Sequence, residues 1–341
     1  MIFNTTSAEV LDHDLSLDTH YALLKQIVFA VAAITIAVSV RTIGYRRLLV
    51  LSPYLLVFFI FLLVLCLTPG IGREVNGSKR WISLAGISLQ PSEFVKYLIP
   101  IYVIYHFSKV DPTTLSLKAF VKIFSLLLLP IGLILIEPNN GTVGVILMTL
   151  ICLCFLLRIP AHFWAWPLAA LLLLGSFAAY QLPYVRGRLK VYWNPELDLR
   201  GKGHQPYQAK IAAGSGGLFG NGPGSSLQKF SYLPEAQNDY IAAIYAEEFG
   251  FAGIAFLIFL YMLLAYAGLS IALRYPNSEG AYMAAIITFL ISIQAFMNLG
   301  VVSGLLPSTG LNLPFFSQGG SSLIANMTGI GLLVNLSEVD R

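Results

Sequence analysis

Several carboxylate and amine side chains lie inside or beside strongly apolar segments of this sequence, where an ionisable group is expensive to bury. Glu93 and Lys96 are three residues apart, so on a helix they share one face and can form an ion pair. Glu137 stands in a tight turn after an apolar run, and Asp239 falls where a long polar segment returns to an apolar one. A carboxylate in such a place can take a proton from a hydroxyl nucleophile.

Each of these residues also has a structural interpretation. For Glu93 and Lys96 taken alone, an ion pair that closes a helix end is the favoured one. Glu137 can be a carboxylate that faces solvent at the membrane surface. Asp239 can be an ordinary helix N-cap, which the helix dipole favours. Spacing alone does not decide between these structural roles and catalysis.

The apolar composition of the chain determines what elements can position these groups. Hydrophobic residues make up 57% of the 341 residues, charged residues only 11%, and the mean hydropathy is +0.74. A typical soluble domain is about 45–50% apolar and about 25% charged. The composition therefore excludes a soluble globular enzyme, a disordered chain and a disulfide scaffold. No P-loop or Rossmann fingerprint is present, and the three cysteines lie in apolar runs without metal-ligand spacing.

The predicted fold is an all-α polytopic membrane protein with about nine transmembrane helices. A span needs roughly 20 mostly apolar residues, and continuous Leu, Ile and Phe runs such as 54–65 lack the alternation of β-barrel strands. The predicted helices are 22–40, 48–67, 92–108, 119–136, 141–157, 163–180, 240–272, 281–302 and 319–336.

Basic residues in the short loops predict the orientation of the chain. Arg41, Arg46 and Arg47 join the first two helices, and the positive-inside rule places such loops in the cytoplasm. Residues 181–239 then form one long extracytoplasmic loop. It holds seven Lys and Arg against four Asp and Glu. Either an anionic ligand or incidental solvated charge explains this excess, and charge alone does not decide between them.

Polar and glycine-rich motifs gather in four segments on the predicted outer side. Ser92 precedes a helical run and is interpreted as an N-cap. The glycine-rich stretch 214–224 is either a backbone that approaches a ligand closely or a flexible linker. The motifs are Arg80-Trp81, Gln90-Pro91-Ser92-Glu93 with Lys96, Glu137-Pro138 with Gly141-Thr142, Gly216-Gly217-Leu218-Phe219-Gly220, Leu233-Pro234-Glu235, Asp239, Glu247-Glu248 with Gly250, Leu306-Pro307 and Gly319-Gly320-Ser321-Ser322.

In this order and with this membrane spacing, the motifs resemble the SEDS family (shape, elongation, division and sporulation) over residues 22 to 337. The stretches 226–229 and 232–236 resemble the division branch, FtsW, more than the elongation branch, RodA. Asn139 departs from the family pattern, which usually has Asp there. Family members have ten spans, so the resemblance implies that the first span is missing before residue 22 and that the chain begins at an internal Met or is a truncated form.

The resemblance implies a single integral-membrane domain over 1–341 and a peptidoglycan glycosyltransferase of class 2.4. Such an enzyme polymerises lipid II at the outer face of the bacterial cytoplasmic (inner) membrane, here in septal wall synthesis. Asp239 is the implied catalytic base. The implied substrate-binding residues are Arg80, Glu93, Lys96, Glu137, Thr142, Gln208, Gln228, Lys229, Glu235, Ser321 and Ser322.

A divalent cation, Mg²⁺ or Mn²⁺, is a candidate cofactor because it would bind the substrate diphosphate and these carboxylates. The sequence has no dedicated metal motif, and no organic cofactor is expected. The implied partners are a class B penicillin-binding transpeptidase and other division proteins, with no nucleic acid.

Three other functions stay open on the sequence alone. They are an elongation-type polymerase, a lipid II flippase and a non-catalytic division scaffold. A flippase needs ionisable groups that reach the inner half of the membrane, whereas the groups found here collect on the predicted outer side.

Overall fold

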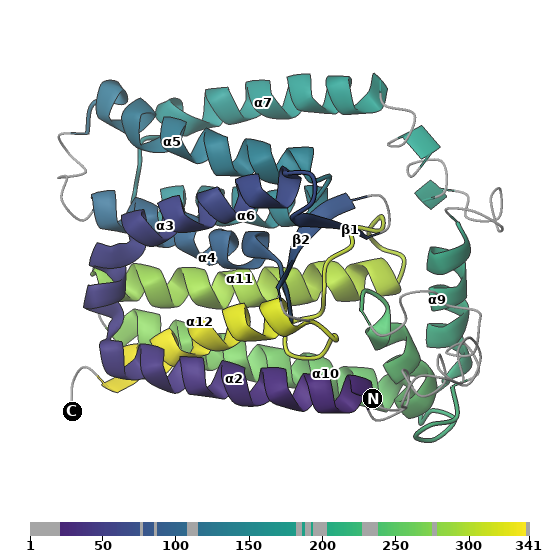
Figure 1. Ribbon diagram of the computed structural model, residues 1–341. Helices are drawn as coiled ribbons and strands as arrows, with labels where there is room; N and C mark the ends of the chain where they lie inside the picture. Colours follow the sequence, from purple (N-terminus) through teal and green to yellow (C-terminus); the bar gives the residue numbers. More distant parts are fainter. Residues whose placement is uncertain are drawn as a thin grey trace. The chain divides into compact units, whose positions relative to one another are not determined.

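The computed structural model of the protein describes residues 21–75, 78–84, 87–107, 115–181, 186–187, 192–193, 203–226, 238–274 and 278–338 (Figure 1). Each of the nine predicted helices has a counterpart within these ranges, with ends that differ by at most three residues. The helices are α2 (Tyr21–Ile43), α3 (Tyr45–Leu67), α4 (Pro91–Phe107), α5 (Leu117–Ile136), α6 (Asn140–Leu156), α7 (Ala161–Gln181), α10 (Ile241–Arg274), α11 (Glu279–Val302) and α12 (Gly320–Glu338).

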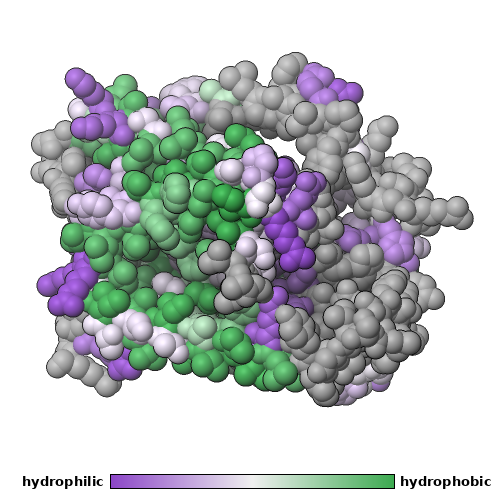
Figure 2. All heavy atoms as spheres, in the orientation of Figure 1, coloured by the Kyte–Doolittle hydropathy of each residue, from purple (hydrophilic) through white to green (hydrophobic). Residues whose placement is uncertain are grey.

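The protein is an all-α polytopic membrane protein. Within the described ranges, α2 from Leu23 onward, α3, α5, α10 and α11 are long and apolar enough to cross a membrane, and α6 is a shorter apolar helix. Helices are suited to the lipid bilayer because each helix satisfies its backbone hydrogen bonds internally, and lipid offers no partners for unsatisfied N–H and C=O groups. On the face drawn in Figure 2, hydrophobic side chains cover the middle of the helices and hydrophilic ones gather toward their ends.

The chain forms two compact units, each described here by itself. The first unit contains the described parts of 1–28, 165–263 and 294–319, and the second contains those of 29–164, 264–293 and 320–341. In the second unit, α4 packs against α3, α5, α6 and α12. Its core includes fully buried Leu56 and Leu63 on α3, and Ile99 and Ile104 on α4. Because α4 contacts four other helices and its side chains are buried among them, it lies at the centre of this unit.

A small antiparallel sheet in the second unit was not predicted from the sequence. Its strands are β1 (Gly72–Val75), β2 (Ser78–Leu84) and β3 (Ile87–Leu89), in the order β1-β2-β3. Arg73 pairs with Trp81, and Ile82 pairs with Leu89. The sequence does carry a hairpin signal, since Asn76-Gly77 is a favoured two-residue turn between strands. Hydropathy alone does not detect this signal.

The first unit contains a broken helix, where a continuous span over 240–272 was predicted. At Gly250, α10 has φ 66° and ψ −165°, a conformation outside the helical region that glycine adopts without a steric penalty. A break inside an apolar helix leaves backbone groups without helical partners, and these must be satisfied by other protein groups.

The glycine-rich loop after α9 (His204–Ser215) satisfies them. Asn221 N donates to Glu247 O at 3.0 Å and Gly222 N to Glu248 O at 3.0 Å. In the other direction, Phe251 N donates to Gly217 O at 2.9 Å and Ala252 N to Leu218 O at 3.0 Å. The stretch 216–222 is therefore an ordered clamp on the break in α10, and the interpretation as a flexible linker is wrong.

Glycine is required for a steric reason at three positions of this contact. A Cβ added at Gly216, Gly220 or Gly250 would overlap backbone atoms of the opposite segment. The Ser226 hydroxyl continues the contact by donating a hydrogen bond to the Glu247 carboxylate. Two backbones thus pack directly on each other at the break, and residues 241–249 separate this contact from Asp239.

Candidate functional site

Asp239 lies in the first unit, two residues before α10 begins at Ile241. Tyr240 O accepts the first helical bonds, from Ala243 N at 2.8 Å and Ile244 N at 3.5 Å. The N-cap position therefore falls on Tyr240, one residue after Asp239. By position, Asp239 is not the N-cap that the structural interpretation of the sequence assumed.

The loop 303–319 lies against Asp239 within the first unit. A Cβ built at Gly310 would lie 3.6 Å from Asp239 Oδ2, so the backbone of this loop approaches the carboxylate closely. The Asp239 side chain is half-buried, whereas Tyr240 and Ile241 next to it are buried. A half-buried carboxylate beside an apolar helix can meet a hydroxyl group of a membrane-anchored substrate.

In the second unit, Glu93 and Lys96 form the ion pair that their spacing predicted. Lys96 Nζ lies 2.7 Å from Glu93 Oε2. Glu93 is 4% exposed and Lys96 is 2% exposed, so the pair lies inside the protein. A buried pair of this kind is costly to break, because removal of one partner leaves the other as an uncompensated charge.

Hydroxyl and amide groups surround the start of α4. Ser92 Oγ accepts hydrogen bonds from Gln90 Nε2 at 3.1 Å and Asn139 Nδ2 at 3.2 Å. Gln90 N donates to Ser321 Oγ at 2.9 Å. The predicted N-cap at Ser92 is wrong, since the helix already begins at Pro91, which suits the first helical position because it needs no N–H partner there.

The same cluster extends along α4 and α12. Tyr97 OH donates to Asn326 Oδ1 at 2.7 Å, and Asn326 Nδ2 donates to Ser322 Oγ at 3.3 Å. Ser321, Ser322 and Asn326 are buried. Lys96 Nζ lies 5.6 Å from the centre of the Tyr97 ring, so Tyr97 links the ion pair to the same hydroxyl and amide groups. The structure thus brings four predicted site residues of the second unit into one polar cluster: Glu93, Lys96, Ser321 and Ser322.

Glu137 is the C-cap of α5 and is fully buried, so the solvent-facing interpretation is wrong. Neither carboxylate oxygen has a hydrogen-bond partner among the described residues. Burial raises the pKa of Glu137 to about 8, although the Arg80 guanidinium opposes this rise. Arg80 Nε donates to Glu137 O at 2.8 Å and an Arg80 Nη to Pro138 O at 2.6 Å, so Arg80 caps the end of α5 through backbone carbonyls.

The remaining predicted site residues are distributed as follows. Thr142 is buried in the first turn of α6, where its N–H donates to Asn139 Oδ1 at 3.4 Å. Gln208 is half-buried on α9. Gln228, Lys229 and Glu235 lie outside the described residues.

Several polar residues of both units were missed by the sequence analysis. In the second unit these are Asn139 and Asn326, and in the first unit Asn298 and Ser317, which contact the backbone around Asp239. Asn298 and Asn326 lie inside apolar helices, and an amide in such a place must find a partner. That rule is the signal that could have found them.

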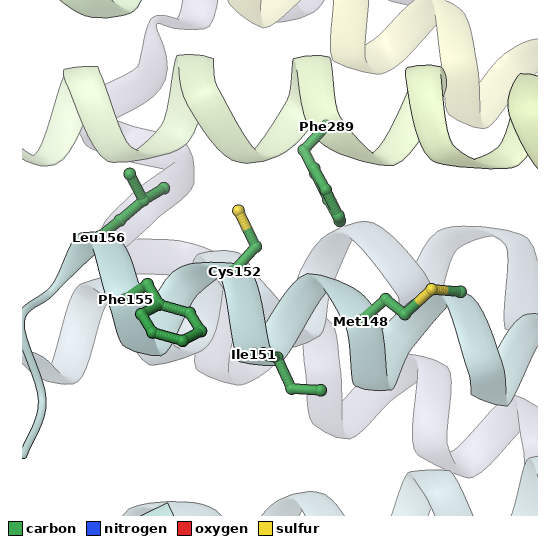
Figure 3. Close-up of a pocket in the computed structure, with 6 residues that line it drawn as sticks. All are labelled: Met148, Ile151, Cys152, Phe155, Leu156 and Phe289. Atoms are coloured by element: carbon green, nitrogen blue, oxygen red, sulfur yellow. The ribbon is translucent and has the colours of Figure 1, made fainter. Parts of the chain in front are cut away.

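An apolar pocket in the second unit lies between α6 and α11 (Figure 3). Phe289 projects from α11 toward α6, and Cys152 points its sulfur toward α11. The lining offers contact to hydrocarbon but no group for acid–base chemistry. The lining residues are Met148, Ile151, Cys152, Phe155, Leu156 and Phe289.

Comparisons with known proteins extend over the whole chain. A protein-family model described as "Cell cycle protein" (FTSW_RODA_SPOVE) matches residues 1–341. "Stage V sporulation protein E" of Bacillus subtilis (strain 168) is 38% identical over 329 residues, which cover 95% of this chain and 89% of that protein. "Probable peptidoglycan glycosyltransferase FtsW" of Coxiella burnetii (strain RSA 493 / Nine Mile phase I) is 37% identical over 341 residues, which cover 98% and 90%.

Two solved structures are similar in fold. One is a chain from the work described as "Structural coordination of polymerization and crosslinking by a peptidoglycan synthase complex". It is 27% identical, with a TM-score of 0.77, and the match covers 100% of this chain and 98% of that one. The other is the rod shape determining protein RodA of Thermus thermophilus, which is 27% identical with a TM-score of 0.67, covering 99% and 94%.

Proposed function

The chain belongs to the cell cycle protein family of FtsW, RodA and SpoVE, and from this premise we propose that it is a peptidoglycan glycosyltransferase, as its FtsW relatives are named. The proposed substrate is lipid II at the outer face of the bacterial cytoplasmic membrane. The proposed setting is septal wall synthesis during division. The observation that supports the chemistry is the half-buried Asp239 carboxylate at the start of α10, which an adjoining loop approaches closely.

In the proposed reaction, the 4-hydroxyl of one lipid II attacks the anomeric carbon of the growing lipid-linked strand. The new C–O bond forms while the bond to the diphosphate breaks, and undecaprenyl diphosphate leaves. Asp239 takes the proton of the attacking hydroxyl, because a neutral hydroxyl is a poor nucleophile and a carboxylate within hydrogen-bond reach makes it a better one.

A diphosphate leaving group develops negative charge that must be stabilised. Mg²⁺ typically binds proteins through one or two carboxylates together with substrate phosphates. The described residues hold no group of three or more His, Cys, Asp or Glu with metal-site geometry. Asp239 fits as a single carboxylate ligand, so a divalent cation would be held by Asp239 and the substrate diphosphate and would neutralise the leaving group.

The buried cluster around Glu93 and Lys96 has a supporting place in this proposal. The ion pair lies within α4, and the hydrogen bonds of the Ser321 and Ser92 hydroxyls join the start of α4 to α12 and to the start of α6 within the second unit. We propose a class B penicillin-binding transpeptidase as the partner. The similar chain in the peptidoglycan synthase complex supports a partner that crosslinks strands.

The test is polymerisation of purified lipid II by the purified protein, with and without the transpeptidase. Asp239→Asn keeps the shape and hydrogen-bonding capacity of the side chain but cannot accept the proton. We expect it to lower turnover at least about 10²-fold. Asp198→Asn, the same chemical change within the segment 181–239, is the control and should retain activity.

Two results would contradict the proposal. Near-normal polymerisation by folded Asp239→Asn would remove Asp239 from the mechanism. Movement of lipid II across vesicles by a protein that never polymerises it would favour the flippase instead.

A further inference from the structure

The backbone on both sides of Asp239 is held by side chains from elsewhere in the first unit. Asn298, on α11, donates from Nδ2 to Asp239 O at 2.9 Å. The same Nδ2 donates to Leu311 O at 2.7 Å. One amide group thus joins the peptide of Asp239 to the loop that faces the Asp239 carboxylate.

Ser317 makes a second link between the same two segments. Its hydroxyl donates to Asn238 O at 2.7 Å and accepts from Leu313 N at 2.8 Å. Asn298 and Ser317 therefore bind the carbonyls of consecutive residues, 239 and 238, and both connect them to residues 311–313.

The orientation of the Asn298 amide is fixed by these bonds. Asn298 is 2% exposed, and its Oδ1 has no hydrogen-bond partner among the described residues. An asparagine amide has two N–H donors, and both carbonyls accept from Nδ2. A flipped amide would place Oδ1 against two carbonyl oxygens, so the side chain is committed to this one arrangement.

We propose that Asn298 and Ser317 are positioning residues that hold Asp239 at the place where it meets the substrate hydroxyl. This proposal rests on the proposed function, in which Asp239 is the base. The two side chains act only through the backbone of 238–239. A displacement of about 1 Å at a reacting group can cost 10²-fold in rate, so their loss should lower kcat without weakening substrate binding.

The chain offers a matched control on the same helix. Gln294, one turn before Asn298 on α11, donates from Nε2 to Asn312 O at 2.8 Å. This bond has the same chemistry, comes from the same helix and ends on the same loop, but its acceptor is the carbonyl of Asn312 and not a carbonyl of residues 238–239. Gln294→Ala therefore reports what loss of a hydrogen bond from α11 to this loop does when the bonds of Asn298 and Ser317 to the carbonyls of 239 and 238 are kept.

The experiment compares Asn298→Ala, Ser317→Ala and Gln294→Ala in lipid II polymerisation by the full-length protein. Activity is expressed per folded molecule, as counted by size-exclusion chromatography. We expect Asn298→Ala and Ser317→Ala each to lower kcat about 10- to 100-fold with KM within about twofold. Gln294→Ala should stay within about twofold on both. Ser317→Ala keeps the test decisive if Asn298→Ala does not fold.

A double variant separates positioning from general stabilisation. If Asn298 acts through Asp239, then Asn298→Ala added to Asp239→Asn should cost no further activity. An equal loss in Gln294→Ala and Asn298→Ala, or a further loss in the double variant, would overturn the positioning role.

The failure of this proposal and that of the proposed function look different. Normal kcat in both Asn298→Ala and Ser317→Ala, with Asp239→Asn inactive, overturns the positioning role and leaves the base in place. Normal kcat in Asp239→Asn overturns the base and the positioning role together.

Discussion

Two buried carboxylates of the second unit meet the cost of burial in different ways. Glu93 is paired with Lys96 at 2.7 Å, so its charge is compensated. Both carboxylate oxygens of Glu137 lack a hydrogen-bond partner among the described residues, and burial raises its pKa to about 8. Desolvation disfavours the charged form, so Glu137 carries a proton near neutral pH.

The raised pKa of Glu137 predicts a stability that falls with pH. The groups that act on Glu137 electrostatically are Arg80 and Cys66. Between its ordinary pKa of 4.5 and about 8, the folded protein keeps a proton that the unfolded chain has lost, so each rise in pH lowers the free energy of unfolding. The stabilisation is complete below pH 4.5 and lost above pH 8.

Glu137→Gln imitates the neutral acid and should remove this pH dependence. We expect the midpoint of thermal unfolding of the original protein to fall from pH 5 to pH 9 relative to that of Glu137→Gln. Glu74→Gln, at an exposed position on β1, is the control. Parallel pH curves for the original protein and Glu137→Gln would show that Glu137 is already ionised.

The Glu93–Lys96 pair predicts an imbalance between single and double variants. Glu93→Gln or Lys96→Met alone leaves one buried charge and should lower the free energy of unfolding by about 3–5 kcal/mol. The double variant contains neither charge of this pair and should recover most of that loss. Unfolding measured in detergent checks this. A double variant that is stable but inactive would assign the pair a role in substrate binding, and a double variant less stable than both singles would contradict the argument.

At the scale of elements, the break in α10 and the loop 216–222 form one structure. Neither is complete alone, because each supplies backbone partners that the other lacks. The contact depends on glycine for two reasons: Gly250 has a positive φ, and a Cβ on Gly220 would overlap the backbone at Glu248 and Phe249.

Substitution at the break should therefore be costly, while a nearby glycine should tolerate it. We expect Gly250→Ala to destabilise the protein by more than about 1 kcal/mol. Gly214→Ala, near the end of α9, meets no atoms within 4 Å and should be neutral or slightly stabilising. Thermal midpoints and the yield of monodisperse protein measure both, and equal midpoints would show that the clamp does not need glycine.

Hydropathy predicted the helices well and the contacts between them poorly. The nine apolar runs became helices because lipid requires internally satisfied backbone. The pairing of Glu93 with Lys96 was also predictable, since both partners lie within one turn. The break at Gly250 was not, because its hydrogen-bond partners lie some thirty residues earlier, at 217–222. The same holds for Asn298, whose partners at 239 and 311 are brought together only by the fold.

At the scale of the whole molecule, the topology is a prediction from the short basic loops. Residues 181–239 should lie outside the cell and the loop 41–47 inside. In a background without Cys66, Cys152 and Cys154, Lys202→Cys should react with a membrane-impermeant maleimide in intact cells. Arg46→Cys should react only after permeabilisation. The reverse pattern would overturn the orientation and the proposed outer-face chemistry with it.

The break at Gly250 makes the first part of α10 a lever arm. Residues 241–249 form a helical rod about 13 Å long at 1.5 Å per residue, with Asp239 just beyond the end that is far from the break. A rotation of about 5° at the break would move that end by about 1 Å, a distance that can cost 10²-fold in rate. The angle at Gly250 thus sets the position of Asp239, and the hydrogen bonds from the clamp 216–222 hold this angle. Small changes in that loop should therefore tune the chemistry from a distance.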